Sequence, residues 1–131
     1  MTSPKPVILC VDDEDTPLLL RKLVLQKAGY DVLTVNSARE ALQVAAVNKI
    51  DLILSDHLMP GVTGVELAVQ LKSLYPRIPV ILLSGVNEIP SGAEVADSFL
   101  SKLEGPEHLC KVVAEALTSF CSSRKLDSLP S

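Results

Sequence analysis

Short, mostly apolar runs alternate along the chain with longer segments in which apolar residues recur every three or four positions. Runs of that length, bounded by polar or turn-forming residues, are typical of strands buried on both faces of a parallel sheet. They cover Val7–Val11, Asp31–Val35, Asp51–Ser55, Pro79–Leu83 and Ser98–Ser101. The segments between them have the period of helices. The alternation predicts an α/β fold, and right-handed crossovers favour a flavodoxin-like, doubly wound, five-stranded parallel sheet of order 2-1-3-4-5.

The first three predicted helices begin at capping signals. Thr16 precedes Pro17 and is expected to cap the first helix, which Gly29 ends. The segments Ser37–Glu40 and Thr63–Glu66 have the spacing of capping boxes, so they predict the starts of the second and third helices. The apolar stripes expected to face the sheet are Leu20, Leu23, Val24 and Ala28; Ala38, Ala41, Leu42 and Ala45; Leu67, Ala68, Leu71 and Leu74; and, in the last helix, Leu109, Val112, Val113, Ala116, Leu117 and Phe120.

The pattern weakens in two places in the second half of the chain. Between Val86 and Ala96 a proline and a glycine interrupt it, so a fourth helix there is expected to be short, degenerate or absent. The last helix is expected to open at Gly105. Residues 122–131 are polar and without helical period. We therefore expect a single domain over residues 1–121 and a disordered tail over residues 122–131.

Composition narrows the functional classes. A chain of 131 residues is long enough for one domain with a sizeable core, either standing alone or as a fragment of a longer protein. The net charge of −4 argues against nucleic acid as a direct partner, because a phosphate backbone needs a basic face. No apolar run reaches the length of a membrane span, and the first residues lack the layout of a signal peptide. Cys10 and Cys110 lie in apolar patterns typical of reduced core thiols, so a cytoplasmic location is expected.

Acidic residues follow two of the predicted strands. Asp12 and Asp13 come directly after the first strand, and Asp56 comes after the third. In the order 2-1-3-4-5 these strands are neighbours, so their carboxyl ends meet at one crevice. Carboxylates so close together repel one another unless a cation compensates, and Mg²⁺ prefers oxygen ligands of this kind. The sequence therefore predicts a Mg²⁺ site at which Asp56 could attack a phosphoryl group as a nucleophile.

Two further polar residues are expected at the same edge of the sheet. Ser84 and Lys102 follow the fourth and fifth predicted strands, where a hydroxyl and an ammonium group can bind phosphoryl oxygens. Each candidate also has a plain structural interpretation. Asp12 to Asp15 could form an acidic helix cap, Asp56 and Ser84 could be turn residues, and Lys102 could be a solvated charge. Their coincidence at the carboxyl ends of four strands favours a functional site.

The ordered set of motifs resembles the receiver domain of two-component response regulators, from Val7 through Phe120. The matching stretches are Asp12-Asp13, Ser55-Asp56-His57-Leu58-Met59-Pro60-Gly61-Val62-Thr63-Gly64, Leu83-Ser84-Gly85 and Phe99-Leu100-Ser101-Lys102. The resemblance implies a signalling domain that accepts a phosphoryl group from a sensor histidine kinase or a phosphotransfer protein and then acts on a downstream protein target. It implies no enzymatic activity beyond the domain's own aspartyl phosphorylation and dephosphorylation.

The resemblance also implies a role for each matching residue. Asp56 would be the phosphoacceptor. The Mg²⁺ ligands would be Asp12, Asp13, Asp56 and the backbone carbonyl of Leu58. Ser84 and Lys102 would contact the phosphoryl group. The pair that switches position on phosphorylation would be Ser84 and Phe99.

Two features depart from the family's pattern. Leu103 follows Lys102 where receivers usually carry proline, often through a cis peptide bond. A cis bond before a non-proline residue costs about 2.5–4 kcal/mol, which favours a trans bond here. The segment between Ser84 and Lys102 is also shorter than is usual in the family, and this reinforces the expectation of a degenerate fourth helix.

Three other interpretations stay open on the sequence. A phosphohydrolase of the haloacid dehalogenase type would need a second acid two residues past Asp56, where Leu58 stands. A flavodoxin-like FMN binder would need a loop rich in serine, threonine and glycine where the chain has acids from Asp12 onward. The third alternative is a receiver fold that binds partners without being phosphorylated. His57 and His108 are interpreted as surface residues and not as phosphohistidine relays.

Overall fold

The structure, a computed structural model, describes residues 5–57, 63–84, 96–101 and 105–128. Its strands are β1 (Val7–Val11), β2 (Asp31–Val35), β3 (Leu52–Asp56), β4 (Val80–Ser84) and β5 (Ser98–Ser101). All neighbouring strands pair in parallel, in the order β2-β1-β3-β4-β5. The predicted sheet is therefore confirmed in its strands, direction and order.

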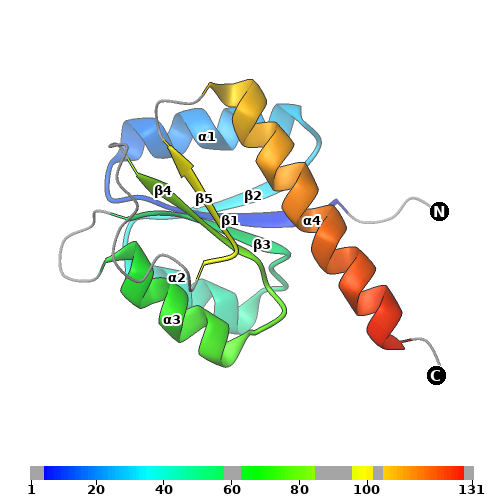
Figure 1. The fold of residues 1–131 in the computed structure, drawn as a ribbon. Coiled ribbons are helices and arrows are strands. Elements are labelled where there is room, and N and C mark those ends of the chain that lie inside the picture. The colour runs from blue at the N-terminus through cyan, green and yellow to red at the C-terminus, as the bar shows by residue number, and fades with distance from the viewer. Residues whose placement is uncertain (1–4, 58–62, 85–95, 102–104, 129–131) are drawn as a thin grey trace.

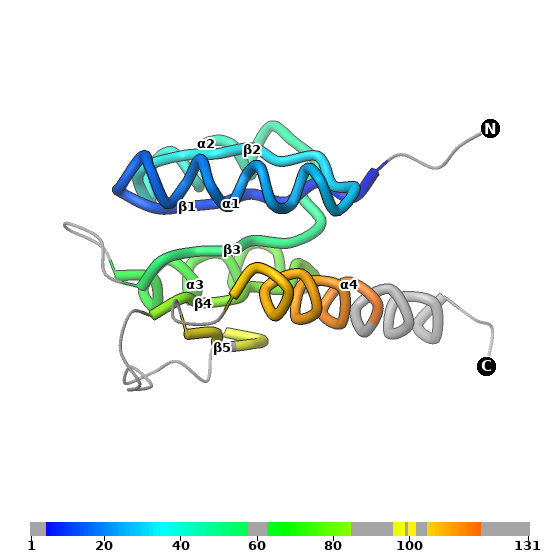
Figure 2. Tube along the Cα trace, turned by 90° about the horizontal axis from the view of Figure 1, so that it is seen from above, coloured from blue at the N-terminus to red at the C-terminus, as the bar shows by residue number. Residues whose placement is uncertain are grey.

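Helices cover both faces of the sheet, as Figures 1 and 2 show. They are α1 (Asp15–Lys27), α2 (Ala38–Val47), α3 (Gly64–Leu74) and α4 (Pro106–Ser128). Helices α1 and α4 lie on one face, over a core that includes Ile8 and Leu54, and α2 and α3 lie on the other, over a core that includes Leu9 and Ile53. Successive strand residues alternate between these two cores, which is why the central strands β1, β3 and β4 are apolar over most of their length. Among the described residues, no helix is both long enough and apolar enough to cross a lipid bilayer.

Strands β3 and β4 each begin and end one residue later than predicted. Asp51 precedes β3, and its side chain accepts a hydrogen bond from the backbone N–H of Val7, at 2.8 Å. The shift makes Asp56 the last residue of β3 and Ser84 the last residue of β4. Both polar side chains are therefore held by strand backbone and not by the loops that follow.

Helix α1 starts earlier than predicted. Its N-cap is Glu14 and not Thr16, and no side chain caps it. The turn before the helix is instead held by Asp12, whose Oδ1 accepts a hydrogen bond from the N–H of Glu14 at 2.9 Å. Gly29 follows the helix with a φ of 105°, a conformation that favours glycine, so the predicted end of the helix is confirmed.

The face that α1 turns to the sheet also differs from the prediction. Three residues expected inside are exposed: Leu20, Leu23 and Ala28. The inner stripe is formed by Leu18, Arg21 and Leu25, at the three- and four-residue spacing of a helix face. The prediction placed Leu20 and Leu23 on the inner face because it used apolar periodicity alone. Periodicity gives no reason to place an arginine on that face.

The second and third helices follow their predicted capping boxes. The Ser37 hydroxyl accepts from the N–H of Glu40, and the Thr63 hydroxyl accepts from the N–H of Glu66, each at 3.1 Å. The predicted stripe of α2 faces the sheet, and α3 buries Leu67, Ala68 and Leu71. Leu74, the last member of the α3 stripe, is wrongly predicted and is 62% exposed. Tyr75, the next residue, packs against the core in its place.

The last helix is longer than predicted. Helix α4 begins at Pro106, buries Leu109, Val113 and Ala116, and continues to Ser128. Backbone of most of the segment expected to be a disordered tail is thus helical, because no residue breaks the helix before Pro130. The expected fourth helix falls mostly within residues 85–95, which lie outside the described residues.

Candidate functional site

Asp56 closes β3 in the middle of the sheet and is 3% exposed. In the sheet it lies opposite Leu83 of β4, and β1 flanks it on the other side. The backbone around it is held on both sides of the strand end. The Ser55 hydroxyl donates to the Asp56 carbonyl at 2.9 Å, and the N–H of His57 donates to the Leu83 carbonyl at 2.9 Å. The carboxylate is therefore anchored on a rigid strand end.

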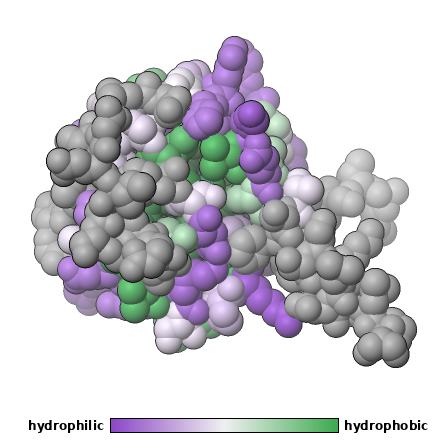
Figure 3. All heavy atoms as spheres, in the orientation of Figure 1, coloured by the Kyte–Doolittle hydropathy of each residue, from purple (hydrophilic) through white to green (hydrophobic). Residues whose placement is uncertain are grey.

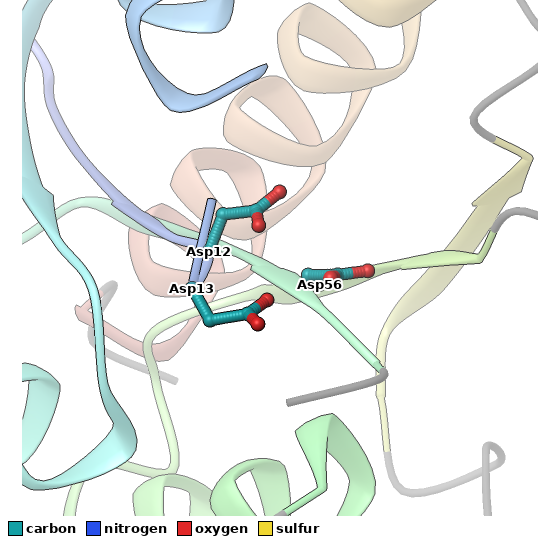
Figure 4. A group of neighbouring side chains, drawn as sticks. All are labelled: Asp12, Asp13 and Asp56. Atoms are coloured by element: carbon teal, nitrogen blue, oxygen red, sulfur yellow. The ribbon is translucent and has the colours of Figure 1, made fainter. Parts of the chain in front are cut away.

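Asp12 and Asp13 extend from the end of β1 toward the same place (Figure 4). Asp12 is fully buried and its N–H donates to the Val35 carbonyl, while Asp13 is exposed. One carboxylate oxygen from each of Asp12, Asp13 and Asp56 lies within 4.8 Å of the other two. The predicted convergence of the acids is confirmed by this geometry.

The oxygen cluster fits a small divalent cation. Octahedral Mg²⁺ holds its ligands at roughly 2.0–2.1 Å, which separates ligand oxygens by about 2.9–4.2 Å. The separation of up to 4.8 Å in the structure needs only a small contraction of the side chains. The donor set contains only oxygen atoms, as Mg²⁺ prefers. Because Asp13 is exposed, water can reach one side of the cluster. Asp12, Asp13 and Asp56 are thus the residues that could hold the metal.

A basic residue that sequence analysis missed completes the cluster. Nη1 of Arg21, on α1, lies 2.6 Å from Oδ2 of Asp12, and the Arg21 side chain is only 12% exposed. The two buried charges compensate each other where neither could be buried alone. The one available signal was spacing, because Arg21 lies three residues after Leu18 and four before Leu25 on the inner stripe.

Ser84 reaches the same edge of the sheet from the next strand. It is the last residue of β4, is 2% exposed, and pairs in register with Ser101 at the end of β5. Of the other predicted site residues, Leu58 and Lys102 lie outside the described residues, as does the peptide bond between Lys102 and Leu103. The backbone of Phe99 lies in β5 opposite Leu82.

His57 and Cys10 lie beside the cluster, and neither is a plain surface residue. His57 is half-buried, contrary to the expectation of a surface residue, and its Nδ1 has no hydrogen-bond partner among the described residues. Cys10 is fully buried in β1, and this burial raises the pKa of its thiol to about 12, which Arg21 partly opposes. The Cys10 thiol is therefore protonated at neutral pH and is a poor nucleophile.

An open cavity of about 390 Å³ lies on the α1 and α4 side of the sheet. It is bordered by Leu20, Arg21 and Val24 of α1, by Leu83 and Leu100 of the sheet, and by Leu109 of α4, among others. Arg21 thus borders both the acidic cluster and this cavity.

The chain matches a known family over most of its length. Residues 8–114 match the model of the response regulator receiver domain. The transcriptional regulatory protein GlrR of Escherichia coli K12 is 34% identical over 120 residues, which cover 88% of this chain and 27% of GlrR. The autoinducer 1 sensor kinase/phosphatase LuxN of Vibrio harveyi is 33% identical over 105 residues, which cover 80% of this chain and 12% of LuxN. The chain thus spans only a minor part of either relative.

Solved structures show the same fold. The response regulator protein TrrA of Thermotoga maritima, in complex with Mg²⁺–BeF, is 30% identical and superposes with a TM-score of 0.80. The match covers 85% of this chain and 98% of TrrA. The fold of this chain therefore agrees with these similarities.

Proposed function

The chain belongs to the family of response regulator receiver domains, and from this premise we propose that Asp56 accepts a phosphoryl group in a Mg²⁺-dependent reaction. The observation that carries the proposal is the convergence of three carboxylates, two of them buried, at the carboxyl ends of β1 and β3. The phosphoryl donor is the phosphohistidine of a sensor histidine kinase or of a phosphotransfer protein.

The reaction is a substitution at phosphorus. A carboxylate oxygen of Asp56 forms the new P–O bond, the P–N bond to the donor histidine breaks, and the released imidazole nitrogen takes up a proton. Bound Mg²⁺ would neutralise charge on the phosphoryl oxygens and so permit a carboxylate to approach them. Asp12 and Asp13 would hold the ion, together with the carbonyl of Leu58.

Neighbouring side chains position the reacting group. Asp56 is nearly buried at the end of a hydrogen-bonded strand, so its carboxylate needs little reorganisation before attack. Ser84 lies at the end of the adjacent strand, where its hydroxyl would donate to a phosphoryl oxygen. Lys102 follows β5 and would place its ammonium group on the same oxygens.

The phosphoryl group would switch the surface that partners recognise. Ser84 would move toward the bound group, and Phe99 would fill the space it leaves, so that two packings exchange. The backbone of Phe99 lies one strand away from β4, opposite Leu82, which supports a coupling between β4 and β5. The downstream target would be a protein that recognises the switched surface.

Beryllofluoride, which mimics an aspartyl phosphate, tests the proposal without a kinase. Nuclear magnetic resonance spectra of the protein are recorded with Mg²⁺ alone and with Mg²⁺ plus beryllofluoride. The proposal predicts saturable shifts at Asp56, Ser84 and Phe99, all lost in Asp56→Asn. Unchanged spectra at saturating beryllofluoride would contradict it.

A further inference from the structure

Arg21 is a basic residue on the face of α1 that packs against the sheet. Its side chain is 12% exposed and lies between Leu18 and Leu25 on the inner stripe of α1. Burying a guanidinium group is costly unless a charged partner compensates it. That partner is the fully buried carboxylate of Asp12, at 2.6 Å.

Both oxygens of Asp12 have partners. Oδ1 accepts from the N–H of Glu14, and Oδ2 accepts from Nη1 of Arg21. A cation that binds Asp12, Asp13 and Asp56 must therefore approach a carboxylate that already holds a positive charge. It must share an oxygen of Asp12 with Arg21 or displace the guanidinium group.

The structure offers space for such a displacement. Arg21 borders the open cavity of about 390 Å³ between α1 and α4. An apolar patch lies where these helices approach each other in Figure 3, and Ser101 adds a polar group to the cavity wall. A guanidinium group that leaves Asp12 can enter this cavity and be hydrated there, while its aliphatic stem stays against the apolar wall.

From these contacts we propose that Arg21 is the internal counter-ion of the acidic cluster and competes with the divalent cation for Asp12. It stabilises Asp12 when no cation is bound and yields it when a cation binds, so it weakens metal affinity and couples metal occupancy to α1. Arg21 acts through Asp12 and is thus a positioning residue. The inference rests on the proposed Mg²⁺ site.

Electrostatic repulsion determines how the Arg21 charge affects Mg²⁺ affinity. The attraction between the cluster and a divalent cation is opposed by a positive charge held against one of the ligands. At an effective dielectric constant of about 20, a charge several ångströms away changes an affinity on the order of tenfold or more. Loss of the Arg21 charge should therefore tighten Mg²⁺ binding, although it removes the ion pair between Arg21 and Asp12.

The test compares Arg21→Met with Lys27→Met, which removes the same charge from the exposed last turn of α1. Arg21→Lys keeps the charge and serves as the conservative variant. The Mg²⁺ dissociation constant is measured by nuclear magnetic resonance titration, and the urea midpoint is measured in excess chelator and in saturating Mg²⁺. These readouts do not depend on phosphorylation.

We expect the Mg²⁺ dissociation constant to fall about tenfold in Arg21→Met and to change less than about twofold in Lys27→Met and Arg21→Lys. We also expect Arg21→Met to have the lowest urea midpoint in chelator. Saturating Mg²⁺ should raise its midpoint more than that of the other variants, because the ion replaces the missing positive charge. An Arg21→Met affinity equal to or weaker than that of Lys27→Met overturns the inference while leaving the Mg²⁺ site in place. If Arg21→Met does not fold, Arg21→Gln, which also removes the charge, takes its place: an affinity tightened about tenfold supports the inference, and one equal to or weaker than that of Lys27→Met overturns it. No Mg²⁺ binding by the wild type overturns the proposed function as well.

Discussion

Gly64 lies directly against Asp56 at the base of the acidic cluster. A Cβ atom on Gly64 would stand 2.5 Å from the Asp56 carbonyl oxygen and 2.8 Å from the Cα of His57. The N–H of Gly64 donates to the His57 carbonyl at 2.8 Å. The first turn of α3 thus touches the backbone that presents the carboxylate, and only a residue without a side chain permits this approach.

We predict that Gly64→Ala destabilises the protein and displaces Asp56. Overpacking of this kind lowers the free energy of unfolding by about 1–3 kcal/mol. The obstructing atoms belong to the backbone, which cannot move away by a change of rotamer. Urea unfolding gives the change in free energy. Gly105→Ala is the matched control, since a Cβ there meets nothing within 4 Å. Equal stability of the two variants would show that the contact at Gly64 is relaxed in solution.

Asp97 is predicted to stabilise the start of β4 more than its ion pair alone would. Its Oδ2 accepts from the N–H of Val80 at 2.8 Å and also lies 2.9 Å from Nζ of Lys72. Asp97→Ala leaves the Val80 N–H without this acceptor and should cost about 1–3 kcal/mol. Lys72→Met removes the ion pair and also the hydrogen bonds from Nζ to the Pro76 and Ile78 carbonyls. These contacts are partly exposed, so water can replace the ammonium group, and this variant should cost less than Asp97→Ala. Chemical denaturation of both variants decides the point, and a larger loss in Lys72→Met would refute it.

Cys10 is predicted to make stability fall at alkaline pH. Burial raises the pKa of its thiol from 9.0 to about 12, so this stabilising contribution is complete below pH 9 and is lost as pH rises toward 12. Between these values the unfolded chain releases a proton that the folded chain retains. The free energy of unfolding should then fall by up to about 1.4 kcal/mol per pH unit. The wild type and Cys10→Ala are denatured in chelator at a series of pH values, from about pH 8 to about two units higher. The change of the free energy of unfolding with pH is compared between them.

The Cys10→Ala variant should show a shallower decline than the wild type over this range. Cys110→Ala is the control, because it retains Cys10 and should keep the wild-type slope. Identical slopes in the wild type and in Cys10→Ala would mean that the buried thiol does not contribute to the alkaline loss.

The aspartyl phosphate is predicted to be long-lived. By the resemblance to receiver domains, the residues two past Asp56 and two past Ser84 would be the ones to align a water molecule for hydrolysis. Here they are Leu58 and Val86, whose side chains cannot hydrogen-bond to it. Leu58→Asn combined with Val86→Glu should therefore accelerate loss of the phosphoryl group, measured from the decay of the phosphorylated protein. A double variant that decays no faster would show that water alignment by these side chains does not limit the rate.

The fold was predictable because each level of the pattern agreed with the next. Apolar strand runs, capping residues such as Ser37 and the turn at Gly29 all favour the same alternation, and the structure has it. The proximity of Asp12, Asp13 and Asp56 could be predicted because the strand order places β1 beside β3.

The inner face of α1 could not be predicted in the same way. Arg21 is buried because a carboxylate from another element meets it, and local periodicity carries no information about that partner. The closeness of Gly64 to Asp56 was hidden for a similar reason. It depends on how α3 approaches the end of β3, a tertiary relationship that the capping box of Thr63 does not encode.

Uptake of a phosphoryl group by Asp56 can be followed by mass spectrometry without a kinase. The wild type and Asp56→Asn are incubated with acetyl phosphate and Mg²⁺, or with acetyl phosphate and excess chelator, and their intact masses are recorded. Borohydride reduction of the product then identifies the modified residue by peptide mass. We predict the mass of one added phosphoryl group on the wild type with Mg²⁺, located at Asp56, and none in chelator or in Asp56→Asn. An added phosphoryl group that persists in Asp56→Asn or in chelator, or a wild type that takes up none, would show that Asp56 does not accept a phosphoryl group in a Mg²⁺-dependent reaction.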